Sequence, residues 1–426
     1  MPRLLYTLAV FLLLPLAFLH LLWRARRQTA YLRHWGERLG IYGERPASAT
    51  PVIWIHAVSV GETHAAAALV TLLRARYPDH AIVFSHTTPT GRATSEQLFG
   101  DRVERLYLPY DTPGAVRRFL RHVRPVLGVI METELWPNLI AACQWSEIPL
   151  LLVNARLSAR SARRYAQLPR LTGEALRGLT AIAAQSEEDA RRLTELGAQD
   201  VMVSGNLKFD LTPAPALVER GQGWRHDWQG ATGRRILLAA STREGEEELI
   251  LDALRRAPIE KLLLLIVPRH PQRFDQVAEL TDRKGYKLQR RSSGEGLAAE
   301  TEVLLGDSMG EMAAYYAASD LAFIGGSLLP YGCQNLIEAC AVGTPVLLGP
   351  STYNFAWAAE AALACGCARQ IGSAEELLAL AASLLADSAA LEKMGVAGLE
   401  FSTRHRGASE RTLALLEKHL PSRSPS

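Results

Sequence analysis

Short apolar runs alternate along the chain with stretches in which apolar residues recur at the spacing of an amphipathic helix. Apolar runs of about four to eight residues predict strands buried on both faces, and the stretches between them predict covering helices. The predicted strands are Val52–His56, Ala81–Ser85, Val126–Ile130, Leu150–Val153, Ala181–Ala184, Val201–Val203, Ile236–Ala240, Leu262–Val267, Glu302–Leu305, Leu321–Ile324 and Pro345–Leu348. The clearest helical patterns are Glu62–Arg76, Pro113–His122, Glu187–Leu196 and Ala408–His419. This rhythm predicts an α/β protein with parallel sheets.

The alternation is interrupted once, between Leu211 and Gly233, where prolines and glycines predict irregular structure and a domain boundary. A chain of 426 residues is long enough for two such domains. We therefore expect an anchor segment at 1–27, a first domain at 28–215 and a second at 216–400. Residues 401–426 are expected to form a helix and a disordered Ser/Pro tail. Two α/β domains predict a ligand cleft between them, formed by loops at the carboxyl ends of strands.

The N-terminal segment Leu4–Trp23 has no charged residue. As a helix it would be about 30 Å long, which matches the hydrocarbon core of a bilayer. A secretory signal is the alternative, but no small-x-small cleavage site follows the segment. We therefore expect a membrane anchor. Pro15 leaves open whether it spans the bilayer or lies in one leaflet.

The formal net charge of +3 is unevenly distributed. Residues 1–45 hold seven Arg and two Glu, whereas the remaining residues are slightly acidic, which argues against a nucleic-acid surface. Arg24, Arg26, Arg27 and Arg33 follow the apolar segment, and by the positive-inside rule they predict that the main body lies in the cytoplasm.

The five cysteines lie in apolar stretches and predict reduced, buried thiols rather than a disulfide framework. Cys365-Gly366-Cys367 also fits a fragment of a metal site, but no second Cys/His pair follows at ligand spacing. We therefore favour structural cysteines here.

A nucleotide-binding pattern follows the predicted strand Leu321–Ile324. Gly325-Gly326-Ser327 allows backbone N–H groups to approach a phosphate, and Asn335 is expected to begin a helix whose dipole favours an anion. Glu338, one turn later, can accept both hydroxyls of a ribose. The alternative is a glycine-rich turn, an Asn cap and a solvated Glu. The combination at this spacing favours a nucleotide site.

Two further loops follow strands in the same half. Val267-Pro268-Arg269-His270-Pro271 would hold Arg269 and His270 at the end of a strand, where Arg269 can pair with phosphate or carboxylate. The segment Ala240–Glu247 also closes a strand and opens a helix. In this second loop a helix cap explains the acidic residues as well as a ligand site does.

In the first half, Ser59, Gly61 and Glu62 follow the strand Val52–His56. Ser59 and Glu62 have the S-x-x-E spacing of a capping box, which by itself explains the carboxylate. The functional alternative is a general base that the positive end of the helix keeps ionised at neutral pH.

Other charged groups follow neighbouring strands, namely Glu132, Glu134 and Arg92. The chain contains no Asp-x-Asp pair, no HExxH and no Gly-x-Ser-x-Gly sequence. We therefore expect a transfer reaction without a metal or another cofactor.

The chain resembles the family of 3-deoxy-D-manno-octulosonic acid (Kdo) transferases of lipid A assembly. The resemblance is carried by segments spread over the whole body and by the N-terminal anchor. These segments are HAVSVGET (56–63), TTPTGR (87–92), ELWPN (134–138), SGNLKFD (204–210), ASTREGEE (240–247), VPRHPQRF (267–274), GDSMGEM (306–312), GGSL (325–328) and NLIEACAVGTPVLLGP (335–350).

The resemblance implies a GT-B fold of two Rossmann-like domains, a CMP-Kdo donor and the tetraacylated lipid A precursor as acceptor. It implies an inverting mechanism with Glu62 as the general base that deprotonates the 6′-hydroxyl of the acceptor. The implied donor contacts are Lys208, Arg269, His270, Gly326, Ser327, Asn335 and Glu338. The implied acceptor contacts are Ser59, Gly61, Arg92 and Glu134.

The chain departs from the family at two places. Members commonly have His-Gly-Gly-His-Asn where this chain has Tyr331-Gly332-Cys333-Gln334-Asn335, and a His where it has Arg243. Asn335 and Glu338 are unaffected, so the departures bear on donor contacts and sugar specificity. Two rival hypotheses are a GT-B enzyme that uses a UDP-sugar on another lipid and a non-catalytic membrane-bound scaffold.

Overall fold

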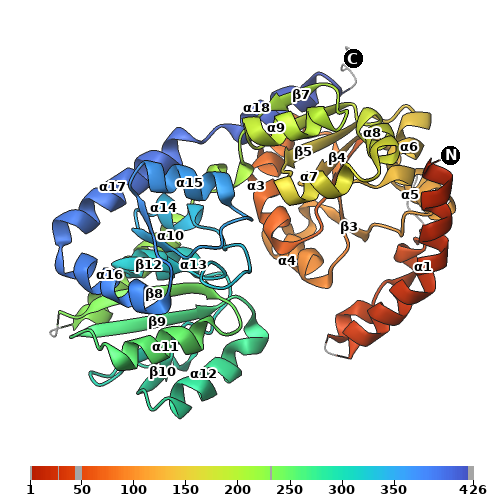
Figure 1. Cartoon of the computed structure of the whole chain (residues 1–426). Coiled ribbons are helices and arrows are strands. Elements are labelled where there is room, and N and C mark those ends of the chain that lie inside the picture. The colour runs from red at the N-terminus through yellow and green to blue at the C-terminus, as the bar shows by residue number, and fades with distance from the viewer. Residues whose placement is uncertain (1, 27, 44–49, 231–232, 421–426) are drawn as a thin grey trace. The chain divides into compact units, whose positions relative to one another are not determined.

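The structure is a computed structural model that describes residues 2–26, 28–43, 50–230 and 233–420. It divides into two compact units (Figure 1). The first comprises Met1–Leu211 with Arg406–Ser426, and the second comprises Thr212–His405. The expected limit at residue 400 falls inside helix α17 (Ser388–Arg404), so the second unit continues to the end of that helix. The expected Ser/Pro tail from residue 421 lies outside the described residues.

The first unit is built on a parallel seven-stranded sheet in the order β3-β2-β1-β4-β5-β6-β7. Its strands are β1 (Val52–His56), β2 (Ala81–His86), β3 (Glu104–Tyr107), β4 (Pro125–Met131), β5 (Leu150–Ala155), β6 (Ala181–Ala184) and β7 (Val201–Val203). The chain order reverses between β1 and β4, which are direct neighbours. In open α/β sheets, such a reversal creates a crevice beyond the carboxyl ends of the strands.

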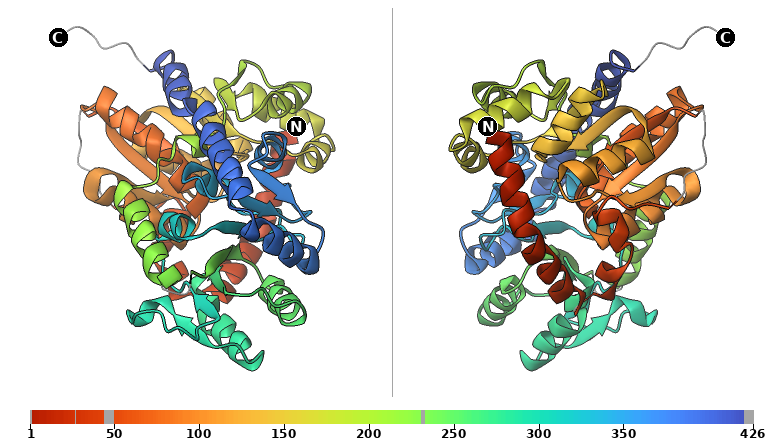
Figure 2. Two further views of the ribbon diagram at one scale, coloured as in Figure 1. Left: turned by 90° about the vertical axis from the view of Figure 1, so that its left-hand side faces the viewer. Right: turned by 90° about the vertical axis from the view of Figure 1, so that its right-hand side faces the viewer.

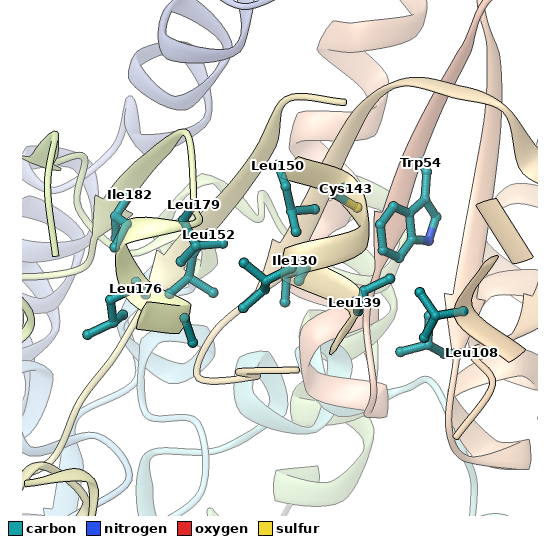
Figure 3. Packing of buried hydrophobic residues seen from close by; sticks show 14 of the residues in the cluster. Trp54, Leu108, Ile130, Leu139, Cys143, Leu150, Leu152, Leu176, Leu179 and Ile182 are labelled. Carbon is teal, nitrogen blue, oxygen red and sulfur yellow. The ribbon is translucent and has the colours of Figure 1, made fainter. Parts of the chain in front are cut away.

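Alternate side chains of β1 enter two different cores. Val52 and Trp54 pack with residues of α5 (Pro113–Val123), α6 (Pro137–Trp145), α8 (Pro169–Arg177) and α9 (Glu187–Glu195) (Figure 3). Ile53 and Ile55 pack with residues of α3 (Val60–Arg76), α4 (Pro89–Phe99) and α18 (Ala408–Glu417). Because successive strand residues point to opposite faces, this continuous apolar strand is covered on both sides.

The second unit also has a parallel seven-stranded sheet, in the order β10-β11-β9-β8-β12-β13-β14. Its strands are β8 (Arg235–Thr242), β9 (Leu262–Pro268), β10 (Leu288–Arg290), β11 (Val303–Leu305), β12 (Leu321–Ile324), β13 (Val346–Leu348) and β14 (Ala368–Gln370). Helices α11 (Glu246–Arg256), α12 (Phe274–Arg283) and α16 (Ala374–Ala386) cover one face. The order reverses between β8 and β12.

The start of the second unit corrects the sequence-based expectation. Residues Pro215–Gln229, expected to be irregular, form helix α10. Gly221 lies inside it, where a Cβ atom would approach the Ala314 carbonyl oxygen of α13 (Met312–Ala318) to 2.3 Å. The glycine therefore permits close packing of two helices instead of ending one.

The apolar N-terminal segment forms helix α1 (Pro2–Ala25), which is long and apolar enough to cross a bilayer. It lies along the first unit (Figure 2). Near its start, the Tyr6 hydroxyl donates to Asp111 at 3.0 Å and the Thr7 hydroxyl to Asn138 at 3.0 Å. Near its end, the ring of Phe18 contacts Tyr110, with centroids 5.4 Å apart. One face of α1 thus packs on protein, while its other leucines are exposed.

Candidate functional site

Three carboxylates gather where the first sheet reverses. Glu62 lies in the first turn of α3, directly after β1, and Glu132 and Glu134 lie in the loop that follows β4. The charge of Glu132 acts most strongly on Glu62 among neighbouring groups, and Glu134 adds to it. The reversal thus brings together two loops that are about seventy residues apart in sequence, which spacing alone did not reveal.

Of the predicted capping box, the bond from Glu62 N to Ser59 is formed, but the Glu62 carboxylate accepts the N–H of Val58 and not that of Ser59. Ser59 caps α3 by accepting a hydrogen bond from Glu62 N at 3.3 Å, and its hydroxyl donates to Glu62 Oε1 at 2.8 Å. Glu62 Oε2 accepts the backbone N–H of Val58 at 2.8 Å. The carboxylate is therefore held in one orientation by the protein itself.

The protonation of Glu62 differs from the sequence-based expectation of a fully ionised base. Burial, followed by the negative charge of Glu132, raises the pKa of Glu62 to about 7. The hydrogen bonds from Val58 and Ser59 oppose this rise but do not cancel it. At neutral pH the group is therefore divided between its acidic and basic forms.

Glu132 itself stays ionised. Burial alone would raise its pKa, but the ammonium group of Lys208 and the guanidinium group of Arg156 outweigh burial and hold the pKa below its usual range. Lys208 Nζ lies 3.0 Å from Glu132 Oε1. The structure thus places Lys208, implied as a donor contact, in the first unit as the partner of a carboxylate next to Glu62. Burial also raises the pKa of Glu134.

Gly61 leaves open space at the start of α3. A Cβ atom there would meet only the Ser59 hydroxyl, at 3.9 Å. At Gly91, by contrast, a Cβ atom would approach the Val58 carbonyl oxygen to 2.9 Å. The protein itself requires glycine at position 91 but not at 61, so the space at Gly61 is available to a ligand.

Arg92 forms its ion pair with Glu37, which does not belong to the group of Glu62, Glu132 and Glu134. Its Nη1 lies 3.0 Å from Glu37 Oε2, and its guanidinium group lies over the ring of Tyr107. Two neighbours in α2 (Trp35–Arg38) were not predicted from the sequence: Glu37 and the buried Arg38, whose Nη2 donates to the Thr87 carbonyl at 3.0 Å. This group of cations and aromatic rings adjoins the loop after β2, and no motif flanking α2 indicated it.

In the second unit, the buried Glu246 joins two of the predicted loops. Its carboxylate accepts backbone N–H groups of Arg243 at 2.8 Å, Gly326 at 2.7 Å and Leu328 at 3.0 Å. The loops after β8 and β12 are therefore fixed to each other at the point where the sheet order reverses. Glu246 thus has a structural role at this helix start.

Arg269 follows β9 and is positioned by Gln334, one of the residues that depart from the family pattern. Arg269 Nε donates to Gln334 Oε1 at 3.1 Å, and Gln334 N donates to the Gly325 carbonyl at 3.0 Å. Burial lowers the pKa of Arg269, while the charge of Glu338 opposes that change. The guanidinium group of Arg269, the glycine loop at Gly325 and the carboxylate of Glu338 therefore lie close to one another.

Asn335 and Glu338 are brought into direct contact. Asn335 Nδ2 donates to Glu338 Oε1 at 2.9 Å, and Asn335 Oδ1 accepts the N–H of Ile337 at 3.1 Å. The helix that follows, α14 (Ile337–Ala341), has five residues. So short a helix has a weak dipole, and the expected contribution of a helix N-terminus to anion binding is not supported.

The other three predicted donor contacts, Gly326, Ser327 and His270, differ in their conformation, hydrogen bonding and exposure. Gly326 has φ 71°, a left-handed conformation that favours glycine. The hydroxyl of the fully buried Ser327 donates to the Ile324 carbonyl and accepts the N–H of Gly349 at 2.8 Å, so it serves the fold. Burial and the cations Arg269 and Arg243 lower the pKa of the exposed His270.

Arg243 stacks on Tyr331, with its guanidinium carbon 4.4 Å from the ring centroid. The two departures from the family pattern therefore contact each other. Among the described residues, no three His, Cys, Asp or Glu side chains are grouped so as to hold a metal ion.

Comparisons with known proteins agree with the resemblance. The family profile described as 3-Deoxy-D-manno-octulosonic-acid transferase (kdotransferase) matches residues 33–211. A 3-deoxy-D-manno-octulosonic acid transferase of Bordetella pertussis is 44% identical over 99% of this chain and 100% of its own length. The transferase of the same name from Haemophilus influenzae is 38% identical, over 99% of both chains.

Solved structures support the fold. A glycosyltransferase from Rickettsia africae aligns with a TM-score of 0.59 at 14% identity, over 88% of this chain and 100% of that one. At this level of identity the similarity concerns the two-domain architecture alone, and it agrees with the predicted GT-B fold.

Proposed function

The chain belongs to the 3-deoxy-D-manno-octulosonic acid transferase family, and we propose that it moves Kdo from CMP-Kdo to the 6′-hydroxyl of the tetraacylated lipid A precursor. It is thus a glycosyltransferase that adds Kdo in the biosynthesis of the lipopolysaccharide core. Donor, acceptor and residue roles are the parts that we propose.

The orientation of Glu62 and its pKa of about 7 carry the proposed chemistry. In its ionised form the carboxylate takes the proton of the acceptor hydroxyl as the oxygen attacks the anomeric carbon of Kdo, and CMP leaves from the opposite face. Two fixed hydrogen bonds, from Val58 and Ser59, keep Glu62 oriented for this transfer. The open space at Gly61 would admit the acceptor sugar.

The second unit would hold the nucleotide. Arg269 would neutralise the phosphate of CMP. Glu338, held by Asn335, would accept the ribose hydroxyls. We propose no role for Ser327, because its hydroxyl is already engaged.

We propose that α1 anchors the enzyme in one leaflet of the inner membrane, with the body on the cytoplasmic side. Contacts near both ends hold the helix to the first unit, and its outward face exposes Leu12 by 79%. Trp145, 76% exposed, extends this apolar face and lies against Arg3 of the helix. A helix held along its length by a folded body is better placed to lie in a leaflet than to span the bilayer.

Product analysis tests the proposed reaction. The purified full chain in detergent would be incubated with CMP-Kdo and lipid A precursor, and the product mass would be measured. We expect an increase by one or more Kdo units and a loss of about 10²- to 10⁴-fold in rate for Glu62→Gln. Gly223→Ala, at a position with open surroundings, is the matched control. Full activity of a folded Glu62→Gln variant would refute the assignment of the base.

A binding measurement distinguishes the CMP donor from the UDP-sugar of the rival hypothesis. We expect CMP, and not UDP, to raise the melting temperature of the purified chain, because only the ligand that binds the native state stabilises it. Protection by UDP alone would contradict the proposed donor.

A further inference from the structure

Three of the five cysteines gather beside strands β13 and β14. The Sγ atom of Cys367 lies 3.4 Å from that of Cys365 and 3.8 Å from that of Cys340. All three thiols are free. Cys340 belongs to α14, Cys365 follows α15 (Ala356–Ala364), and Cys367 immediately precedes β14. Cys367 is thus the neighbour that both other thiols share.

The chain geometry places the Cys365 and Cys367 thiols on the same side of a tight turn. Gly366 between them has φ 82°, the left-handed conformation that glycine adopts at little cost. Both thiols donate to the carbonyl oxygen of Ala362, each at 3.4 Å. Cys365 is exposed, whereas Cys340 and Cys367 are almost completely buried. One thiol of the group is therefore open to solutes and the other two lie behind it.

We propose that Cys365 and Cys367 form an oxidation site for hydroperoxides, with Cys340 as an internal exchange partner. The exposed thiolate of Cys365 attacks the peroxide, which yields a sulfenic acid and water. The Cys367 thiol displaces the hydroxyl group as a second water, and a Cys365–Cys367 disulfide forms. Two thiols are thereby oxidised and one hydrogen peroxide is reduced to two waters.

Thiol–disulfide exchange can then transfer the disulfide to the buried cysteines Cys340 and Cys367. Cys340 attacks Cys367 Sγ, the Cys365–Cys367 bond breaks, and the proton lost by Cys340 passes to Cys365. The resulting Cys340–Cys367 bond would join α14, which carries Glu338, to the start of β14. Burial raises the pKa of Cys365, so the first step is slow at neutral pH and becomes faster as the pH rises.

The test follows thiols instead of transferase activity, so its outcome is independent of the proposed function. The full chain would be treated with hydrogen peroxide at pH 7 and pH 9, denatured in N-ethylmaleimide, and analysed by intact mass and peptide mapping. We expect the wild type to lose two labels, with the disulfide mapped among Cys340, Cys365 and Cys367, and to react faster at pH 9.

Single variants separate the steps. Cys340→Ser should form only the Cys365–Cys367 disulfide, and Cys365→Ser should react at least tenfold more slowly. Cys367→Ala should form no disulfide and instead carry oxygen on Cys365. Cys143→Ala, which removes a cysteine of the first unit, should behave as the wild type. Retention of all five labels by the wild type, or a disulfide that includes Cys143 or Cys333, would overturn the proposal without reference to any variant.

Discussion

Oε1 of Glu132 lies 3.0 Å from Nζ of Lys208, so the carboxylate at the end of β4 is held by a cation of the segment after β7. Glu132 also has φ 60°, an uncommon conformation for a residue with a side chain. Such backbone strain persists where the surrounding structure enforces it. Lys208 keeps Glu132 ionised, and the negative charge of Glu132 acts on Glu62.

Removal of that charge should change the pH dependence of catalysis. In Glu132→Gln the neighbouring negative charge is absent, so the pKa of Glu62 should fall below its value of about 7. The acid limb of kcat/KM against pH, which reports ionisation of the free enzyme, should move to lower pH. Glu134→Gln is the control, because its charge acts less on Glu62 and should shift the limb less. An unchanged acid limb in Glu132→Gln would contradict the proposed coupling.

The raised pKa of Glu62 should also make folding stability depend on pH. Below about pH 4.5 the folded and unfolded states both hold the proton. Between this pH and about 7 the unfolded state releases it while the folded state retains it, so the free energy of unfolding falls as pH rises. Glu62→Gln cannot titrate and should gain stability relative to the wild type between pH 5 and pH 8. Urea unfolding at both pH values measures this change, and a constant difference would argue against a raised pKa.

Two alanine substitutions should distinguish a glycine that leaves room for a ligand, Gly61, from a glycine that the packing of the protein requires, Gly91. Gly61→Ala should leave the fold intact, because alanine favours a helix by about 1 kcal/mol over glycine and meets little protein. It should raise KM for the acceptor. Gly91→Ala should destabilise the first unit by about 1 to 3 kcal/mol, because the new methyl group meets the Val58 carbonyl. Unchanged acceptor KM in Gly61→Ala would remove that position from the site.

Gln334 should act on donor binding through Arg269. Gln334→Ala removes the acceptor that fixes Arg269 Nε, and KM for the donor should rise roughly tenfold, equivalent to about 1.4 kcal/mol. Gln334→Glu keeps an acceptor oxygen and should retain more of the affinity. Equal donor KM values for the wild type and Gln334→Ala would show that Arg269 needs no such support.

The buried strands were predictable from the sequence, whereas three strands at the sheet edges were not. β1 and β12 were located correctly because both faces are covered, which requires a continuous apolar run. β3, β10 and β14 lie at sheet edges, and their exposed or partly exposed polar residues interrupt the apolar pattern. Edge strands depend on a neighbour's hydrogen bonds, which a local pattern does not contain.

Contacts in the candidate site were predictable where both partners lie within one sequence motif. Ser59 and Glu62 lie three residues apart, and Asn335 and Glu338 form a similar local pair. The pairing of Glu132 with Lys208 joins residues from two distant loops, and so does the contact of Glu246 with Gly326. These pairs follow from the strand order, which the sequence pattern does not determine.

Helix α18 affects the order in which the two units can fold during translation. It is translated after every strand of the first sheet, yet Leu415 and Leu416 belong to the core under β1, and Asp210 caps its start by accepting the N–H of Gly407 at 2.6 Å. The second unit, Thr212–His405, is continuous and has all its residues available earlier. A nascent chain can therefore complete its second unit first, while the first unit, whose strands were translated earlier, waits with an open core until α18 has been made.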